Sequence, residues 1–317
     1  MSAPRRIASL ISSATEMLYA IGLRDRVVAV SHECDYPDEV LTKPRVTLSH
    51  IGADKPSQVI DDQVKQLLSQ GEPLYDIDAK LLAELGPDLI VTQAQCDVCA
   101  IRYDDVIQTV NSIEALRGTR VLSLNPLSLE EILSDIHRVG QAVGATESAE
   151  RVVDQLKERI AAIVTKTAGL SPRERPRVAS IEWIEPVMFA GNWMPRLVEI
   201  AGGKNGLSEA GKHSGYGNWN ALVDFDPEVI VLMPCGFDLS RTLEESHALS
   251  SFSGWASLSA VKADRVFAVD GNAYFNRSGP RLVDSLEMLA HWIHPEVVEF
   301  RRDFQKESAW RRISTNP

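Results

Sequence analysis

Cysteine thiols are the groups of this 317-residue chain best suited to bind a metal ion. Four cysteines, each predicted to follow a strand, occur at Cys34, Cys96, Cys99 and Cys235. Thiolates bind Zn²⁺, Cu(I) and iron–sulfur centres, and Cys96-X-X-Cys99 has the spacing of half a zinc site. A zinc ribbon needs a second such pair, however, and cysteine is also a common buried hydrophobe. The thiols therefore predict either a zinc or iron–sulfur centre or four unrelated core or turn residues.

Aromatic side chains gather in the second half of the chain, although only 6% of all residues are aromatic. Flat apolar walls with a few polar groups suit a large planar ligand. Five residues are predicted to form these walls: Trp183, Trp193, Tyr216, Trp219 and Phe275. The alternative is that Trp183 and Trp219 fill a core, which we expect of at least one of them.

Polar residues that follow the predicted strands complete the candidate site. Ligands of open α/β sheets bind beyond the carboxyl ends of the strands. The residues predicted to contact a ligand from such positions are Ser12, His32, Asp35, Tyr36, Gln95, Glu182, Asn276 and Arg277. The chain contains no GxSxG, no P-loop and no GxGxxG after a strand. We therefore expect a binding protein without catalytic residues rather than an enzyme.

Strands and helices alternate along the whole chain, which is typical of parallel sheets covered by helices. Residues 13–16 read as a capping box, and Gly22 as the stop of the helix that follows. A long helix is predicted near the midpoint. After it the pattern restarts, because three strand segments at 177–181, 222–231 and 264–269 echo segments at 6–10, 85–91 and 119–124.

These patterns predict an α/β fold of two Rossmann-like lobes with parallel sheets and a ligand cleft between the lobes. The N-terminal lobe is predicted over residues 1–145, the connecting backbone helix over 146–170, and the C-terminal lobe with its C-terminal helix over 171–317.

Charge and hydropathy exclude several classes of partner. The net charge is −11, the pI is about 5.2 and the basic residues form no run, which argues against nucleic acid or an anionic membrane surface. No apolar stretch approaches the ~20 residues of a transmembrane helix. The first residues lack the basic start and apolar core of a secretory signal. We therefore expect a cytoplasmic protein, or a periplasmic one if a signal peptide has been removed.

Several segments resemble the substrate-binding proteins of ABC importers with a helical backbone, especially the group that binds vitamin B12 and iron chelates. Residues 9–18 resemble the family's opening strand and helix, and Cys34-Asp35-Tyr36-Pro37 its first ligand-site loop. Residues 197–203 and 277–281 are similar to landmarks of its second lobe. The segment from Ser57 to Asp76 is longer than the family's connection.

The resemblance implies a ligand that contains a metal: a corrinoid such as cobalamin, or a related metal chelate. Family members also dock on an ABC permease through one glutamate on each lobe. The corresponding positions here, near Asp104 and near Trp193, hold no glutamate, although Asp104 and Asp105 are close. We therefore expect a soluble binder whose docking on a permease is doubtful. The alternatives are a cysteine-ligated metalloprotein or enzyme, and an importer subunit that has lost its signal peptide.

Overall fold

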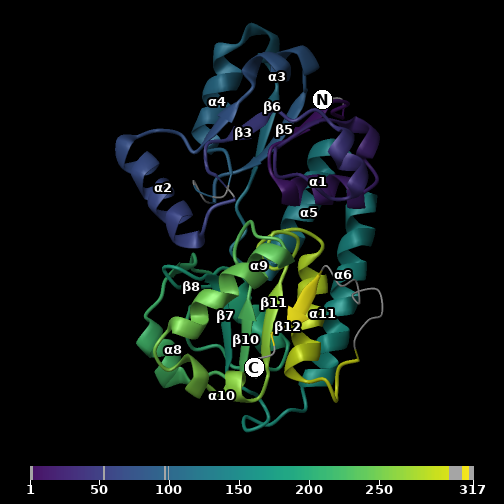
Figure 1. Ribbon diagram of the computed structural model, residues 1–317. Coiled ribbons are helices and arrows are strands. Elements are labelled where there is room, and N and C mark those ends of the chain that lie inside the picture. Colours follow the sequence, from purple (N-terminus) through teal and green to yellow (C-terminus); the bar gives the residue numbers. More distant parts are fainter. Residues whose placement is uncertain (1–2, 53, 96–97, 99, 300–308, 314–317) are drawn as a thin grey trace. The chain divides into compact units, whose positions relative to one another are not determined.

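The computed structural model describes residues 3–52, 54–95, 98, 100–299 and 309–313. The chain forms two compact units. Unit 1 comprises Met1–Gly52, Asp62–Pro126 and Glu130–Gln155, and unit 2 comprises Ala53–Asp61, Leu127–Leu129 and Leu156–Pro317. Each unit is a helix-covered sheet, which confirms the predicted two-lobed α/β class (Figure 1).

Unit 1 is built on a four-stranded sheet in the order β2-β1-β5-β6. Its strands are β1 (Ile7–Ser9), β2 (Val27–Val30), β5 (Leu89–Gln93) and β6 (Arg120–Leu124), and every pairing is parallel. β1 and β5 are buried throughout, as expected of parallel strands covered on both faces. A separate antiparallel pair joins β3 (Thr47–Ser49) to β4 (Tyr75–Ile77).

Helices cover this sheet on both faces. The helices of this part of the chain are α1 (Ser12–Ala20), α2 (Ser57–Gln70), α3 (Ala79–Leu85), α4 (Tyr103–Ser112) and α5 (Leu129–Val143). Short 3₁₀ turns lie at Arg24–Arg26, Asp38–Thr42 and Glu114–Leu116. Leu82 of α3 and Val106 of α4 pack against Ala8 and Ile90, so these helices cover one face, and α1 covers the other (Figure 1).

The start of α1 differs from the prediction. The N-cap is Ile11, and no side chain caps the helix. Ser13, the predicted cap, lies inside the helix, Thr15 donates its hydroxyl to Ser9 Oγ at 2.8 Å, and Glu16 is buried. The predicted capping box is therefore wrong, because burial against the sheet redirects these side chains. The predicted stop is confirmed: the helix ends at Ala20, and Gly22 has a φ of 84°.

Unit 2 is built on a six-stranded sheet in the order β12-β11-β10-β7-β8-β9. The strands are β7 (Val178–Trp183), β8 (Met188–Phe189), β9 (Gly215–Tyr216), β10 (Val229–Leu232), β11 (Val266–Val269) and β12 (Trp310–Arg312). β7, β10 and β11 are parallel, whereas β8, β9 and β12 pair antiparallel at the two edges. The predicted parallel sheet is thus confirmed for the centre, and the complete sheet is mixed.

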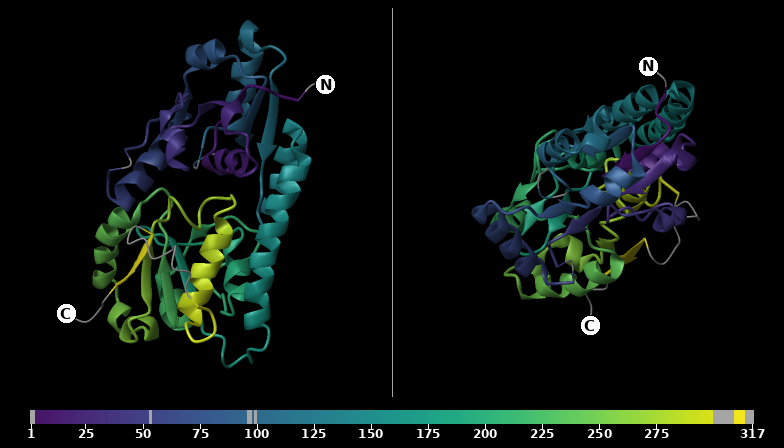
Figure 2. Two further views of the ribbon diagram at one scale, coloured as in Figure 1. Left: turned by 90° about the vertical axis from the view of Figure 1, so that its right-hand side faces the viewer. Right: turned by 90° about the horizontal axis from the view of Figure 1, so that it is seen from above.

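The helices of the second half are α6 (Thr146–Thr167), α7 (Met194–Ile200), α8 (Trp219–Phe225), α9 (Leu239–Ser246), α10 (Ser259–Lys262) and α11 (Leu282–Ile293), with 3₁₀ turns at His247–Ser251 and Trp255–Ser257. α6 occupies the place of the predicted connecting helix, and its residues are divided between the two units. Within unit 2, Arg159 of α6 donates to Glu287 of α11 at 2.8 Å and also pairs with Asp284, so the two helices lie side by side (Figure 2).

The three sequence echoes mark equivalent strands of the two units. β1, β5 and β6 are neighbours in unit 1, as β7, β10 and β11 are in unit 2. The echo includes polar contacts: the Arg6 N–H donates to Asp88 in unit 1, and the Arg177 N–H donates to Glu228 in unit 2, both at 3.0 Å. The repeated pattern therefore encodes a repeated strand arrangement.

No helix in the described part of the chain is both long and apolar enough to cross a membrane.

Candidate functional site

In unit 2 the carboxyl ends of β7 and β10 form a switch point. The chain leaves β7 towards β8 and leaves β10 towards β11, which lie on opposite sides of the pair. In α/β sheets, ligands bind beyond the carboxyl ends of the strands at such a point of divergence. The two exits are bonded together, because Met233 N–H donates to Ile181 O at 2.8 Å and Cys235 N–H to Glu182 O at 3.1 Å.

Glu182 supplies the carboxyl group of this switch point. It is half-buried, and Ser214 Oγ donates to its Oε2 at 2.6 Å. Burial raises the pKa of Glu182 to about 7, against the opposing effect of the Ser214 hydrogen bond. The sequence reasoning named Glu182 and missed Ser214, although Ser214 follows directly after a histidine in a glycine-bearing loop.

Trp183, the residue that follows Glu182, packs against a second aromatic ring. The ring of Trp183, the next residue, lies 5.2 Å from the ring of Phe237, and Arg241 stacks over Phe237 at 4.8 Å. The Trp183 indole nitrogen is buried and has no hydrogen-bond partner in the described part of the chain. Tyr216 is 59% exposed and donates its hydroxyl to Asp61 at 2.6 Å. Trp183 and Tyr216 are thus placed at the carboxyl-end side of the sheet, as predicted wall residues would be.

Two other predicted wall residues lie in the interior of unit 2. Trp193 is 5% exposed and donates its indole N–H to Phe275 O at 2.7 Å. Phe275 is fully buried, with its ring 5.9 Å from that of Trp292. Their assignment as walls is corrected, because rings enclosed by other side chains offer no surface to a ligand.

The remaining predicted residues of the second half, Trp219, Asn276 and Arg277, make contacts within unit 2 or are buried in it. Trp219 packs edge-on against Phe252 at 4.7 Å and joins the core cluster, as the alternative for one tryptophan required. Asn276 donates its amide to Met233 O at 2.7 Å and to Gly271 O at 2.9 Å, so its side chain ties two strand exits together. Arg277 is buried.

In unit 1 the corresponding switch point lies between β1 and β5. Ser12 is the first residue of α1, which follows β1, and it is buried. His32 follows β2, and Thr47 Oγ1 lies 2.7 Å from its Nδ1 and accepts its backbone N–H at 2.9 Å. Its ring stacks on Tyr75 at 5.3 Å. Burial, helped by the charge of Arg45, lowers the pKa of His32. The sequence reasoning found His32 but missed Thr47 and Tyr75, which lie far away in the sequence.

Three further unit 1 predictions lie on loops after the strands. Tyr36 is exposed, Asp35 is half-buried, and Gln95 is half-buried with its N–H donated to Gln93 Oε1. Nothing in the structure tests whether these residues contact a ligand, so their role stays a prediction.

The cysteines gain no support as a metal centre. Cys34 is 1% exposed, and its sulfur lies 3.1 Å from Thr15 Oγ1 and 3.5 Å from Ser31 Oγ. Cys235 is a free, half-buried thiol. Cys96 and Cys99 lie outside the described residues. Among the residues that are described, no three His, Cys, Asp or Glu side chains are grouped to hold a metal ion. Cys34 is therefore a buried residue in contact with two hydroxyl groups, and we assign no metal to Cys34 or Cys235.

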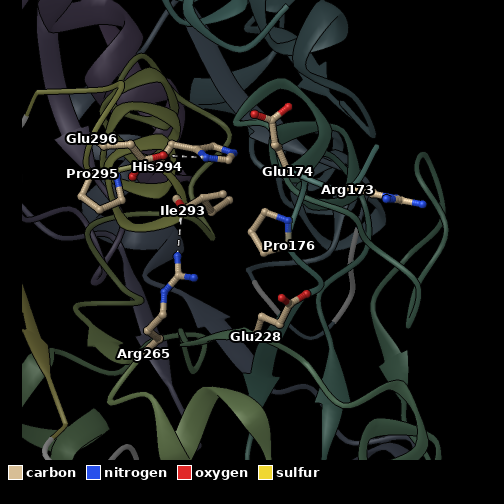
Figure 3. A pocket seen from close by; sticks show the side chains of 9 residues that line it. All are labelled: Arg173, Glu174, Pro176, Glu228, Arg265, Ile293, His294, Pro295 and Glu296. Atoms are coloured by element: carbon tan, nitrogen blue, oxygen red, sulfur yellow. Dashed lines mark hydrogen bonds and ion pairs between the residues drawn. The ribbon is translucent and has the colours of Figure 1, made fainter. Parts of the chain in front are cut away.

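A second candidate is a hollow of about 330 Å³ in unit 2, shown in Figure 3. Glu228 and Arg265, which line it, directly precede β10 and β11, so it lies at the amino ends of the strands. Its polar groups already serve the fold. Arg265 donates to the carbonyls of Trp292 and Ile293 at 2.9 Å, and His294 Nε2 lies 3.1 Å from Gly202 O. We therefore favour the opposite, carboxyl end as the ligand site.

Comparison with known proteins agrees with this architecture. The sequence profile of the family described as periplasmic binding protein matches residues 7–273. The chain belongs to the periplasmic binding protein family. The predicted resemblance is thereby confirmed.

Individual family members match over most of their length. An ABC transporter substrate-binding lipoprotein of Bacillus subtilis, YvrC, is 26% identical over 93% of this chain and 81% of its own length. A vitamin B12-binding protein of Vibrio cholerae is 23% identical over 91% of this chain and 88% of its own. The crystal structure of a periplasmic heme-binding protein from Pseudomonas aeruginosa superposes with a TM-score of 0.69 at 20% identity, covering 93% and 94% of the two chains.

These family members contradict the prediction of a cytoplasmic location. Their names place them in the periplasm or identify them as lipoproteins of ABC transporters. The prediction depended on the first residues of the sequence, and it is wrong because relatives that match almost the whole chain lie outside the cytoplasm.

Proposed function

We propose that this protein is the extracytoplasmic substrate-binding component of an ABC importer, and that it binds a metal chelate, with a corrinoid such as cobalamin as the first candidate. The observation that carries the proposal is the family match over residues 7–273, together with a vitamin B12-binding relative that aligns over 91% of the chain. Heme is the second candidate, because a structural neighbour of the same fold binds it.

The groups at the carboxyl end of the unit 2 sheet fit such a ligand. The half-buried Trp183 offers aromatic surface backed by the buried ring of Phe237, and Glu182 with Ser214 offers hydrogen-bonding atoms. Large planar ligands bind to apolar walls that carry a few oriented polar groups. In unit 1, the exposed Tyr36 and the half-buried His32 supply similar chemistry after β2.

The proposal includes an ABC permease as partner and replaces the sequence-based doubt about docking. Asp104 is exposed in the first turn of α4, whereas Asp105 is held by Arg102 at 2.9 Å. Asp104 is thus the acidic group of that turn available to a basic partner surface.

Binding without catalysis is the activity that this family implies. The rival hypothesis is an enzyme with a cysteine-ligated zinc or iron–sulfur centre. Cys34 does not support it, because its sulfur contacts the hydroxyl groups of Thr15 and Ser31.

Equilibrium dialysis of the purified protein against cyanocobalamin, hemin and a ferric siderophore tests the proposal. We expect one of these to bind with a Kd of about 1 µM or below, which corresponds to about 8 kcal/mol. Failure of all three to bind would contradict the proposal.

A matched pair of variants locates the ligand. Trp183→Leu removes a ring at the switch point and should weaken binding about tenfold or more, the equivalent of ~1.4 kcal/mol. Trp219→Leu removes an equal ring from the core cluster, so it should lower stability and leave the Kd unchanged. The reverse result would place the ligand elsewhere.

A further inference from the structure

The carboxyl group of Glu182 lies at the point where β7 and β10 diverge. Its backbone carbonyl accepts the Cys235 N–H at 3.1 Å, which fixes the main chain of β7 against the exit of β10. The side chain is half-buried at the end of the sheet where ligands of this architecture bind.

A single hydroxyl group orients this carboxyl. Ser214 Oγ accepts the Gly191 N–H at 2.9 Å, so its own hydrogen is directed to Glu182 Oε2 at 2.6 Å. Gly191 lies tightly against the same loop, because an added Cβ would lie 2.3 Å from Lys212 O. The Ser214 hydroxyl is therefore held in place, and with it one oxygen of Glu182.

In the described part of the chain no cation is bonded to Glu182. Lys212, on the same loop as Ser214, pairs with Glu209 at 3.3 Å, and His213 beside it is exposed. Across the switch point, Arg241 stacks on Phe237, donates to Lys55 O at 2.7 Å and pairs with Glu245 at 3.5 Å. The free thiol of Cys235 and the half-buried Glu185 on the β7–β8 turn bring no positive charge.

A carboxylate removed from water without a cation is costly, and the group stays protonated instead. In agreement, burial raises the pKa of Glu182 to about 7. A positive charge brought to the free oxygen of this carboxyl would supply the missing partner and stabilise the ionised form.

We propose that Glu182, held by Ser214, is a cation subsite of unit 2 that exchanges its proton for a positively charged group of the ligand, such as a metal complex of net positive charge. On binding, the carboxyl O–H bond breaks, the proton passes to solvent, and the carboxylate pairs with the cation. The inference rests on the proposed function, because it assigns a role in recognition of the same ligand.

Two cobalt corrinoids separate charge from shape. Aquacobalamin carries a net positive charge at pH 6, whereas cyanocobalamin has nearly the same shape and is neutral. Calorimetric titration at pH 6 in two buffers of different ionisation enthalpy counts the protons released. The visible spectrum of the cobalt complex, recorded alongside, shows whether its axial water has been replaced by a protein ligand.

We expect aquacobalamin to release nearly one proton at pH 6 and its affinity to rise by up to about tenfold per pH unit between pH 5 and 6. Cyanocobalamin should release none and show no such rise. Glu182→Gln should abolish the proton release and the pH dependence, while the matched control Glu185→Gln retains both. Should Glu182→Gln fold poorly, Ser214→Ala keeps the test valid: it removes the hydrogen bond that opposes burial, so proton release should persist and shift to higher pH.

Equal binding of the two corrinoids without proton release overturns this inference and leaves the proposed function standing. Failure of both to bind overturns the inference together with its corrinoid ligand. Proton release that persists in Glu182→Gln assigns the exchange to another group and also overturns it.

Discussion

The two switch points are built on the same strand plan but differ in chemistry. In unit 1 the polar groups after β2 satisfy one another: His32 with Thr47, and Cys34 with Thr15 and Ser31. In unit 2 the carboxyl group of Glu182, in the last two residues of β7, has one hydroxyl partner and no bonded cation among the described residues. The difference shows that two units with the same strand arrangement can carry different chemical groups at equivalent positions. In unit 1 these side chains bind one another, whereas in unit 2 the carboxyl group of Glu182 keeps one oxygen to which none of the described residues brings a cation.

Two aromatic residues of unit 2, Phe275 and Tyr216, differ in exposure, and the largest change in stability should come from the buried Phe275. Phe275→Ala removes a fully buried ring and should lower the free energy of unfolding by about 3–5 kcal/mol. Tyr216→Ala, on the exposed side, should change it by no more than about 0.5 kcal/mol. Chemical denaturation measures both, and equal losses would remove the distinction between interior and wall.

The unit 1 arrangement depends on one hydroxyl group. Thr47→Val keeps the shape of the side chain but leaves the His32 backbone N–H without its acceptor, so unfolding should become easier by about 1–3 kcal/mol. Thr47→Ser retains the oxygen and should recover most of that loss in the same denaturation series. An unchanged Thr47→Val variant would show that the His32 contacts do not rigidify this loop.

In unit 2 the carboxyl group should make stability depend on pH. The pKa of Glu182 is raised from 4.5 to about 7, so the folded protein binds more protons than the unfolded chain between these values. Its contribution is therefore fully present below pH 4.5 and is lost as the pH rises to about 7. Melting curves of the ligand-free protein should show this loss relative to Glu182→Gln, and identical pH profiles would refute it.

The smallest expected difference between the two units is in the reactivity of their cysteine thiols. Cys34 is enclosed in unit 1, whereas Cys235 is half-buried in unit 2. Brief alkylation of the native protein, followed by peptide mapping, should label Cys235 and spare Cys34, because reactivity follows exposure. Equal labelling of both residues would show that the unit 1 loop opens readily.

Much of the fold could be predicted from the sequence, because buried parallel strands and helix ends have characteristic residues within a short segment. The hydrophobic strands β1 and β10 and the stop at Gly22 were predicted from residues within one element. The capping box failed for the opposite reason: Thr15 turns to Ser9, a contact that depends on the packing of α1 on the sheet.

The site was predicted less well, because a strand-exit position does not fix where a side chain points. Glu182 and Phe275 were both predicted to follow strands, yet Glu182 lies at the end of β7 by the switch point and Phe275 lies inside unit 2. Partners such as Ser214 and Thr47 come from distant segments, and their side chains carry no local signal of their own.

Hydrogen exchange with and without cyanocobalamin tests the central claim most directly, namely that a metal chelate binds at the carboxyl ends of the strands. Ligand should slow exchange in residues 31–37, 182–184 and 211–217, and leave residues 173–177 and 293–296 around the 330 Å³ hollow unchanged. Protection confined to the hollow, or no protection anywhere at saturating ligand, would contradict the account.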